Sequence, residues 1–580
     1  MYRTCFLVFL TFSTFFSISL FALTTTFPFN RHVPLVHHSA KSRDRLGAVA
    51  SLSALCSRIG TNILQIGGNA VDAAIATQFC LGVTGMELTG LGGGGFALVR
   101  ASNGSFDAID FRESAPAQAS EDMYQDNIEA SVYGGLAVGV PGELQGLEYL
   151  HRHYGTLPWD QLIRPASKVA REGFRVGKRL VKAMDRLGPD SILTKDPLWS
   201  IDFAPNGTRL GLGDIMTRKR YGRLLDTIAR KGPEAFYTGD IADATIRAIQ
   251  SKGGIMTIDD LADYRVLRRA PVMTDYRGYR LASCGSPAGG AVLLQIMNIV
   301  NGYADIGRLD SLNLSVHRLD EAMRFAFASR AYLGDPEFVE GMADYEARML
   351  NLYVAAEIRN RILDNSTQPI SAYNPDGLES LITHGTSHLS VIDQSGMAVS
   401  LTSTINLNFG SLVMVPETGL ILNNEMNDFS VPNTTNEYGY VPSPENFIRP
   451  RKRPLSSITP VIVDSLNDET KSQTSYFVTG GAGGSRIITA TALSLWRVLD
   501  QKMSLIEALE APRWHDQLIP NSMYLEQTFS NDTVAAMRDR GHDVIWGDAL
   551  SNVQVVRRMP NGTLEAAAEP RQPGSGGFAV

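Results

Sequence analysis

A glycine–threonine pair in the last third of the chain is the sharpest chemical feature of the sequence. Gly385 and Thr386 stand directly before a run of strand-forming residues. A threonine hydroxyl is a poor nucleophile unless a base lies beside it, and cleavage of the 385–386 bond would supply one as the new α-amino group of Thr386. Gly385 suits such a cut because a residue without Cβ leaves its carbonyl open to attack. Taken alone, however, the pair also fits a threonine that merely begins a strand.

A glycine-rich segment further along the chain is the second candidate for chemistry. Residues 480–485 read Gly-Gly-Ala-Gly-Gly-Ser, between a predicted strand over 476–479 and a predicted helix over 487–499. Backbone N–H groups at a helix N-terminus have no intrahelical partner. Such a loop therefore suits an anion or a developing oxyanion.

The elements that would position these residues are a hairpin and several helices. Residues 388–392 and 397–401 are β-type runs around Asp-Gln-Ser-Gly, which predicts a hairpin that starts just after Thr386. Asn69 predicts an N-cap, with a buried helix over 70–81 because that segment is apolar nearly all round. Glycines at 92–95 indicate close backbone approach, and their spacing fits no phosphate loop. Residues 319–333 predict a further helix with one buried face.

Composition bounds the function classes. The 580 residues include 44% hydrophobic ones, so a sizeable core can form. The net charge is −7, and the basic clusters at 218–220 and 449–453 are short, which argues against nucleic acid as the main partner. The ten histidines and four cysteines match no zinc-site spacing, so we predict no metal site.

The N-terminus predicts a place outside the cytosol. An uncharged, mostly apolar stretch over 5–27 follows Arg3, and about 20 such residues span a bilayer. We read 1–27 as a signal-anchor or a signal peptide and 28–45 as a linker whose end, 40–45, is polar. The anchor is slightly favoured, which gives a single-pass type II membrane protein with an extracellular body; the alternative is secretion. Seven sequons agree with either: Asn103, Asn206, Asn313, Asn365, Asn433, Asn531 and Asn561.

Several separated blocks carry a family resemblance. In the first half they are residues 68–74, 92–95, 111–113 and 140–143, and in the second half 383–391, 403–406, 423–429, 453–457 and 483–484. In this order they closely resemble the γ-glutamyltranspeptidase (glutathione hydrolase) family in its eukaryotic form. The resemblance covers nearly everything after about residue 45.

The resemblance implies a fold and a maturation step. The expected class is α+β, an αββα sandwich of the N-terminal-nucleophile (Ntn) hydrolase type. Self-cleavage between Gly385 and Thr386 would yield a large subunit, 46–385, and a small catalytic subunit, 386–580, which stay associated. Cys56 and Cys80 fit a family disulfide, with Cys284 as the unpaired remainder because Cys5 lies in the N-terminal segment.

The resemblance also implies a role for each site residue. Thr386 would be the nucleophile and Thr404 would orient it, while Gly483 and Gly484 would form the oxyanion hole. The other matched residues would hold the zwitterionic γ-glutamyl end of the donor: Arg112, Ser456 and Ser457 its α-carboxylate, and Asn406, Glu425 and Asp428 its α-ammonium.

The implied reaction is two acyl transfers through one covalent intermediate, without a cofactor. Thr386 would take the γ-glutamyl group from glutathione or its conjugates and pass it to water, an amino acid or a dipeptide. Two alternatives stay open: an Ntn acylase with a different donor, and a catalytically inactive surface glycoprotein with a binding role. Asn408 departs from the aromatic residue of mammalian relatives, which puts the pocket rim and acceptor preference in doubt.

Overall fold

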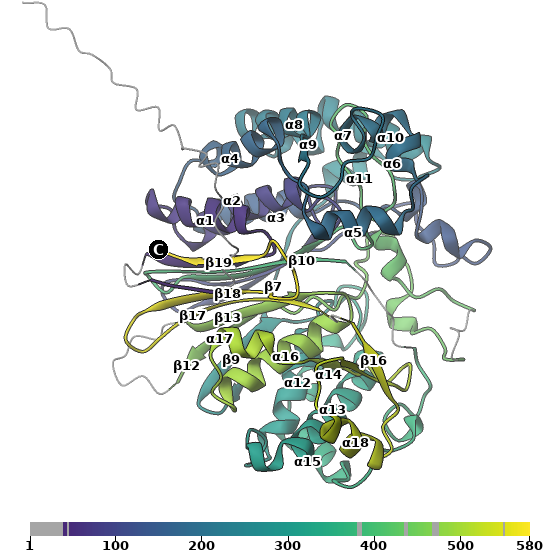
Figure 1. The fold of residues 1–580 in the computed structure, drawn as a ribbon. Helices are drawn as coiled ribbons and strands as arrows, with labels where there is room; N and C mark the ends of the chain where they lie inside the picture. The colour runs from purple at the N-terminus through teal and green to yellow at the C-terminus, as the bar shows by residue number, and fades with distance from the viewer. Residues whose placement is uncertain (1–38, 43–45, 380–384, 434–438, 467–474, 549–550) are drawn as a thin grey trace, which may run out of the picture. The chain divides into compact units, whose positions relative to one another are not determined.

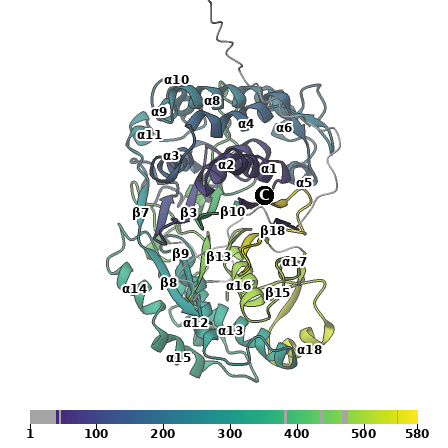
Figure 2. The ribbon, with the colours of Figure 1, turned by 90° about the vertical axis from the view of Figure 1, so that its left-hand side faces the viewer.

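The expected αββα layering is present. The computed structural model describes residues 39–42, 46–379, 385–433, 439–466, 475–548 and 551–580. Two seven-stranded antiparallel sheets lie face to face, and helices cover the outer face of each (Figures 1 and 2). One sheet has the strand order β19-β2-β10-β11-β3-β4-β7, and the other β1-β18-β17-β13-β12-β9-β8.

The strands of the first sheet are β2 (Gly47–Ser51), β3 (Gly94–Arg100), β4 (Phe106–Phe111), β7 (Leu267–Arg269), β10 (Ser387–Asp393), β11 (Ala398–Thr404) and β19 (Gly576–Ala579). Those of the second are β1 (Ser39–Ser42), β8 (Pro271–Tyr276), β9 (Tyr279–Cys284), β12 (Val461–Ser465), β13 (Ser475–Ala482), β17 (Asn552–Arg558) and β18 (Leu564–Ala568). Short strands outside these sheets are β5 (Phe174–Arg175), β6 (Ile215–Met216), β14 (Trp514–His515), β15 (Met523–Glu526) and β16 (Val544–Gly547).

Helices over the first sheet come from the first half of the chain (Figure 1). They are α1 (Ala54–Gln65), α2 (Ala70–Thr84), α3 (Glu143–Tyr154), α4 (Trp159–Glu172), α5 (Lys178–Arg186), α6 (Ile192–Lys195), α7 (Pro197–Phe203), α8 (Lys219–Lys231), α9 (Glu234–Tyr237), α10 (Gly239–Ser251) and α11 (Ile258–Asp263). Those on the side of the second sheet are α12 (Gly290–Asn301), α13 (Leu312–Arg330), α14 (Met342–Met349), α15 (Leu352–Arg361), α16 (Arg486–Leu499), α17 (Leu505–Glu510) and α18 (Asn531–Asp539).

The hairpin β10–β11 lies in the middle of the first sheet, and its side chains alternate between two cores. Leu389 and Val391 pack with the covering helices, whereas Ile392 belongs to the core between the two sheets. This follows from the period of two along a strand. Both faces are buried, so the hairpin is held from both sides.

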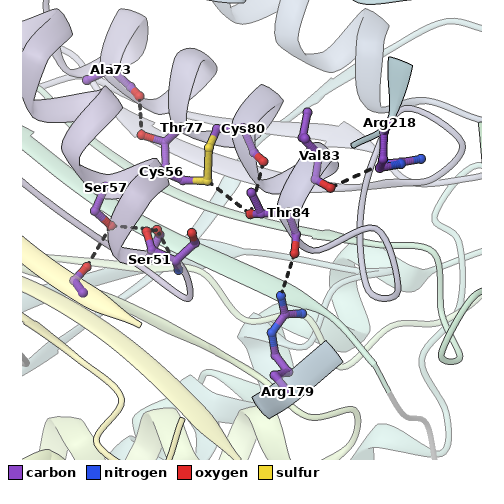
Figure 3. The surroundings of a disulfide bond; sticks show 12 residues. Ser51, Cys56, Ser57, Ala73, Thr77, Cys80, Val83, Thr84, Arg179 and Arg218 are labelled. Carbon is purple, nitrogen blue, oxygen red and sulfur yellow. Dashed lines mark hydrogen bonds between the residues drawn. A yellow bond between two sulfur atoms is a disulfide. The ribbon is translucent and has the colours of Figure 1, made fainter. Parts of the chain in front are cut away.

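Helix α2 forms as the sequence predicts and runs three residues beyond the expected end. The side chain of Asn69 accepts a hydrogen bond from the N–H of Asp72, whose own carboxylate accepts from the N–H of Asn69, a capping box. A disulfide joins Cys56 of α1 to Cys80 of α2 (Figure 3). At the helix C-terminus, Arg218 donates to the carbonyl oxygen of Gly82 at 2.7 Å, which uses one of the predicted basic clusters inside the fold.

Two boundaries differ from the sequence expectation. Residues 39–42, expected in the linker, form strand β1, which pairs with β18 at the edge of the second sheet, and Lys41 pairs with Glu565 at 2.6 Å. Strand β13 continues through Gly480 and Gly481 to Ala482, so the glycine loop is shorter than expected. Gly480 pairs with Gln554 within the strand, and it is glycine because a Cβ there would lie 2.4 Å from Cε1 of His388 on the facing sheet.

No helix in the described ranges is both long and apolar enough to cross a bilayer. The proposed membrane segment, 1–27, lies outside the described residues.

Candidate active site

Thr386 lies at the N-terminal end of β10 and is buried. The residue before it must be glycine for a steric reason. Gly385 has φ of 87°, and a Cβ built on it would lie 1.8 Å from the carbonyl oxygen of Asn406. The backbone at Gly385 therefore packs directly against the backbone at Asn406, just after β11, and leaves no room for a side chain.

A cleft of about 730 Å³ opens over this junction. Its lining includes Gly385, Thr386 and Gly483, so the threonine and the glycine loop share one cavity, and Asn408 lies on the same lining. Gly483 and Gly484 have φ of 131° and 66° and stand just before α16. Gly483 therefore lines the same cleft as Thr386, whereas Gly484, the next residue, is outside the cleft lining.

Thr404 ends β11, on the strand beside Thr386. The register of the hairpin ends with Ser387 opposite Ser403, so Thr386 and Thr404 are the chain neighbours of the last paired residues. The Oγ1 of Thr404 accepts a hydrogen bond from the N–H of Asn406 at 2.7 Å. This contact fixes the hydroxyl oxygen and leaves the hydroxyl proton free to point across the hairpin.

Behind Ser403 lies a buried carboxylate for which the sequence predicted no role. Glu143, at the start of α3, accepts hydrogen bonds from Ser403 and from Gln78, the latter at 2.9 Å. Burial raises the pKa of Glu143 to about 7, although these hydrogen bonds oppose the shift. The carboxyl group therefore lies beside the strand that carries Thr404 and titrates near neutrality.

A second group of site residues gathers around Arg112, just after β4. Its guanidinium pairs with Glu425 and, at 2.6 Å, with Asp428, and all three side chains are buried. Burial would lower the pKa of Arg112, but the two carboxylates outweigh it and raise that pKa. Burial raises the pKa of Glu425 and brings that of the neighbouring Glu113 to about 7. The fork of an arginine is thus matched to two carboxylates in a buried site.

The remaining residues of this group come from a loop and a helix. Ser456 Oγ accepts from the N–H of Ile458 at 3.1 Å, and Ser457 Oγ accepts from the guanidinium of Arg330 at 3.1 Å. Arg330 is the last residue of α13; burial lowers its pKa to about 10, with Asp428 opposing. The sequence predicted the helix but no chemistry for it, because no local motif marks Arg330.

Asn406 links the two groups. Its Nδ2 donates to the carbonyl oxygen of Asn424 at 3.1 Å, next to Glu425, while its own carbonyl oxygen lies against Gly385. The structure therefore brings the predicted residues together as two neighbouring sets. One set surrounds Thr386 in the cleft; the other is a buried ionic cluster of both charge signs, suited to a small zwitterion.

A buried polar network in the second half of the chain also escaped the sequence prediction. His317 Nδ1 lies 2.7 Å from His542 Nε2, and His542 Nδ1 lies 3.2 Å from Asp320. Asp516 and Glu321 complete two groups of metal-ligand types. Arg324 pairs with Asp516 at 2.8 Å, so one of these carboxylates already has a cation.

Comparisons with known proteins bear on the family and the fold of the chain. The family model of gamma-glutamyltranspeptidase matches residues 56–579. The glutathione hydrolase proenzyme of Arthroderma benhamiae is 48% identical over 564 residues, 95% of both chains, and the glutathione hydrolase of Aspergillus flavus is 44% identical over 93% of this chain and 90% of its own. Among solved structures, cephalosporin acylase from Bacillus halodurans has a TM-score of 0.81 at 28% identity, covering 96% of this chain and 99% of its own. Helicobacter pylori gamma-glutamyltranspeptidase has a TM-score of 0.52 at 35% identity, and the match covers 55% of this chain and 92% of its own.

Proposed function

This chain belongs to the γ-glutamyltranspeptidase family and is a glutathione hydrolase and γ-glutamyltransferase; from that premise we propose that it cuts itself before Thr386 and uses the freed threonine as its nucleophile. The products are a large subunit, which ends at Gly385 and contains β1, and a small subunit, 386–580. Both sheets contain strands from both parts, since β10 lies between β2 and β11, and β12 between β9 and β13. The two subunits therefore stay together after the cut.

The reaction follows from the residues at the cleft. The hydroxyl of Thr386 attacks the γ-carbonyl of the donor, while its α-amino group takes the hydroxyl proton. The backbone N–H groups of Gly483 and Gly484 stabilise the oxyanion, a contribution of about 3–4 kcal/mol for each donor. As the intermediate collapses, the C–N bond breaks and the leaving amine receives the proton. Water, an amino acid or a dipeptide then attacks the ester and releases the γ-glutamyl group.

The buried ionic cluster provides the donor site by exchange of partners. Arg112 already has two carboxylates, so a donor's α-carboxylate replaces one of them on the guanidinium, with Ser456 and Ser457 as further donors. The donor's α-ammonium then compensates Glu425 and Asp428, with the Oδ1 of Asn406 as a neutral acceptor. Because a zwitterion brings one charge of each sign, no buried charge is left without a partner.

We place the protein outside the cytosol, anchored by 1–27 or secreted. The support is the apolar run in the sequence and the position of the sequons. Six of the seven asparagines are exposed: Asn103, Asn206, Asn365, Asn433, Asn531 and Asn561. Asn313 is half-buried, and its Oδ1 accepts from Thr533 at 2.8 Å, so we expect it to carry no glycan. Glycosidase digestion followed by site mapping tests this assignment.

The observation that carries the proposal is the position of Thr386, directly before β10 and in one cleft with Gly483. The test is N-terminal sequencing of purified protein beside Thr386→Ala, followed by assay with a γ-glutamyl anilide. A fragment beginning Thr-Ser-His-Leu-Ser and turnover in the native protein alone are expected. An uncut, inactive native chain would contradict the proposal and favour a binding role. An Ntn acylase with a different donor would cut itself but would not hydrolyse γ-glutamyl donors.

A further inference from the structure

One wall of the cleft is formed by a row of cations on α5. Lys178, Lys182 and Arg186 are spaced by four residues, all three are exposed, and all three line the cleft. Residues four apart lie one above another on a helix, about 6 Å apart along its axis. They therefore form one stripe along the cavity. Arg486, the first residue of α16, adds a further cation to the lining beside Gly483.

These charges are not neutralised within the described ranges. The acidic residue of the lining is Glu87, which is buried and paired with Arg179. Arg571, also on the lining, pairs with Glu526 and with Glu569. Among the residues that the structure describes, Lys178, Lys182, Arg186 and Arg486 have no acidic partner.

The acidic residue within α5 points elsewhere and does not offset the stripe. Asp185 pairs with Arg209 at 2.6 Å. A chain of net charge −7 thus presents several free positive charges at its cleft. The charge at the cleft is thus opposite in sign to the net charge of the chain, which favours an anionic ligand there.

Helix α5 is held firmly, so the stripe keeps its orientation. Leu180 and Met184 are buried and lie outside the cleft lining. Arg179 donates to the carbonyl oxygen of Thr84 at the end of α2, at 3.1 Å, near the disulfide of Figure 3. The side chains that face the cleft are therefore presented by a rigid element rather than by a free loop.

We propose that this cationic wall is a subsite for polycarboxylates on the far side of the scissile amide. The inference rests on the proposed role of Thr386 in this same cleft. The charges of the γ-glutamyl end are already matched by the Arg112 cluster, so these cations serve the other half of the substrate. The ligand class is a peptide or conjugate with two or more carboxylates beyond the γ-glutamyl group, either as the leaving group of a donor or as an acceptor.

The first arm of the test compares donors at fixed enzyme. The donors are a γ-glutamyl anilide with a neutral leaving group, glutathione, and γ-glutamyl-glutamyl-glutamate. The variant is the triple substitution Lys178→Gln, Lys182→Gln, Arg186→Gln. The matched control removes three exposed cations from α8, away from the cleft lining: Lys219→Gln, Arg223→Gln and Lys231→Gln.

Wild-type protein is expected to have a higher kcat/KM for the donor whose Glu-Glu leaving group carries three carboxylates than for the anilide. The difference should lie mainly in KM, since electrostatic attraction acts on binding before the chemical step. In the α5 variant this preference falls by about tenfold or more, while kcat/KM for the anilide stays within about twofold. The α8 control keeps the preference. Added salt shrinks it, because the Debye length falls from about 10 Å at 0.1 M to about 3 Å at 1 M.

A second arm holds the anilide as donor and compares Gly-Gly with Glu-Glu as acceptors. If the α5 variant loses its preference only among donors, the subsite binds leaving groups. If it loses only its preference for Glu-Glu over Gly-Gly as acceptor, the subsite binds acceptors. An unchanged preference in both arms, or an equal loss in the α8 control, overturns the inference. Failure of wild-type protein to turn over any γ-glutamyl donor would instead overturn the proposed function.

Discussion

Gly385→Ala should slow the self-cleavage about 100-fold or more without unfolding the protein. A Cβ at this position lies 1.8 Å from the carbonyl oxygen of Asn406, and real Cβ contacts essentially never fall below 3.0 Å. The partner is backbone and cannot rotate away, so the segment that enters Thr386 must move. A displacement of about 1 Å in a reacting group can cost about 100-fold in rate.

The chain contains a matched control for this substitution. Gly377 has φ of 65°, comparable to the 87° of Gly385, but nothing lies within 4 Å of a Cβ added at Gly377. Gly377→Ala therefore carries the backbone cost of positive φ, about 1 kcal/mol, without the collision. The difference between the two variants isolates the contact with Asn406.

The assay is the time course of chain splitting after expression, read by gel electrophoresis and intact mass, with thermal unfolding of both variants measured in parallel. We expect Gly385→Ala to split about 100-fold more slowly than Gly377→Ala or more slowly still, at similar Tm. Equal rates of splitting in the two variants would refute the steric reasoning.

Three further changes test the ionic cluster, the buried carboxyl group and the disulfide. Arg112→Met leaves Glu425 buried without its cation, so the free energy of unfolding in urea should fall by about 3–5 kcal/mol and donor kcat/KM should collapse; an unchanged denaturation midpoint would contradict this. Since the folded pKa of Glu143 is raised from 4.5 to about 7, its stabilisation is present below pH 4.5 and lost as the pH rises through 7. Glu143→Gln should therefore gain stability relative to native protein across that range, by about 3 kcal/mol, and parallel pH–stability curves would argue against the shift. Replacing both Cys56 and Cys80 by serine opens a loop of sequence separation 24 and should cost about 3–4 kcal/mol, which calorimetry can measure.

Local features were predictable because a few neighbouring residues decide them. The N-cap at Asn69 and the hairpin turn at 393–396 depend on side chains within about one turn of the chain, and both were found at the predicted places. The glycine at 385 and the strand after Thr386 are equally local. The prediction of β1 as a linker was wrong for the opposite reason, since the partner of residues 39–42 is a strand more than 500 residues later.

The hairpin, helix α2 and the family could therefore be predicted from the sequence, because each depends on short motifs. Which charges meet depends instead on how the layers pack. Arg112 reaches Glu425 across 313 residues, and Arg330 enters the same cluster from the end of a helix without any motif. The cationic wall likewise joins α5 to Arg486 from the other half of the chain. Such contacts close loops hundreds of residues long, and no local pattern encodes that packing.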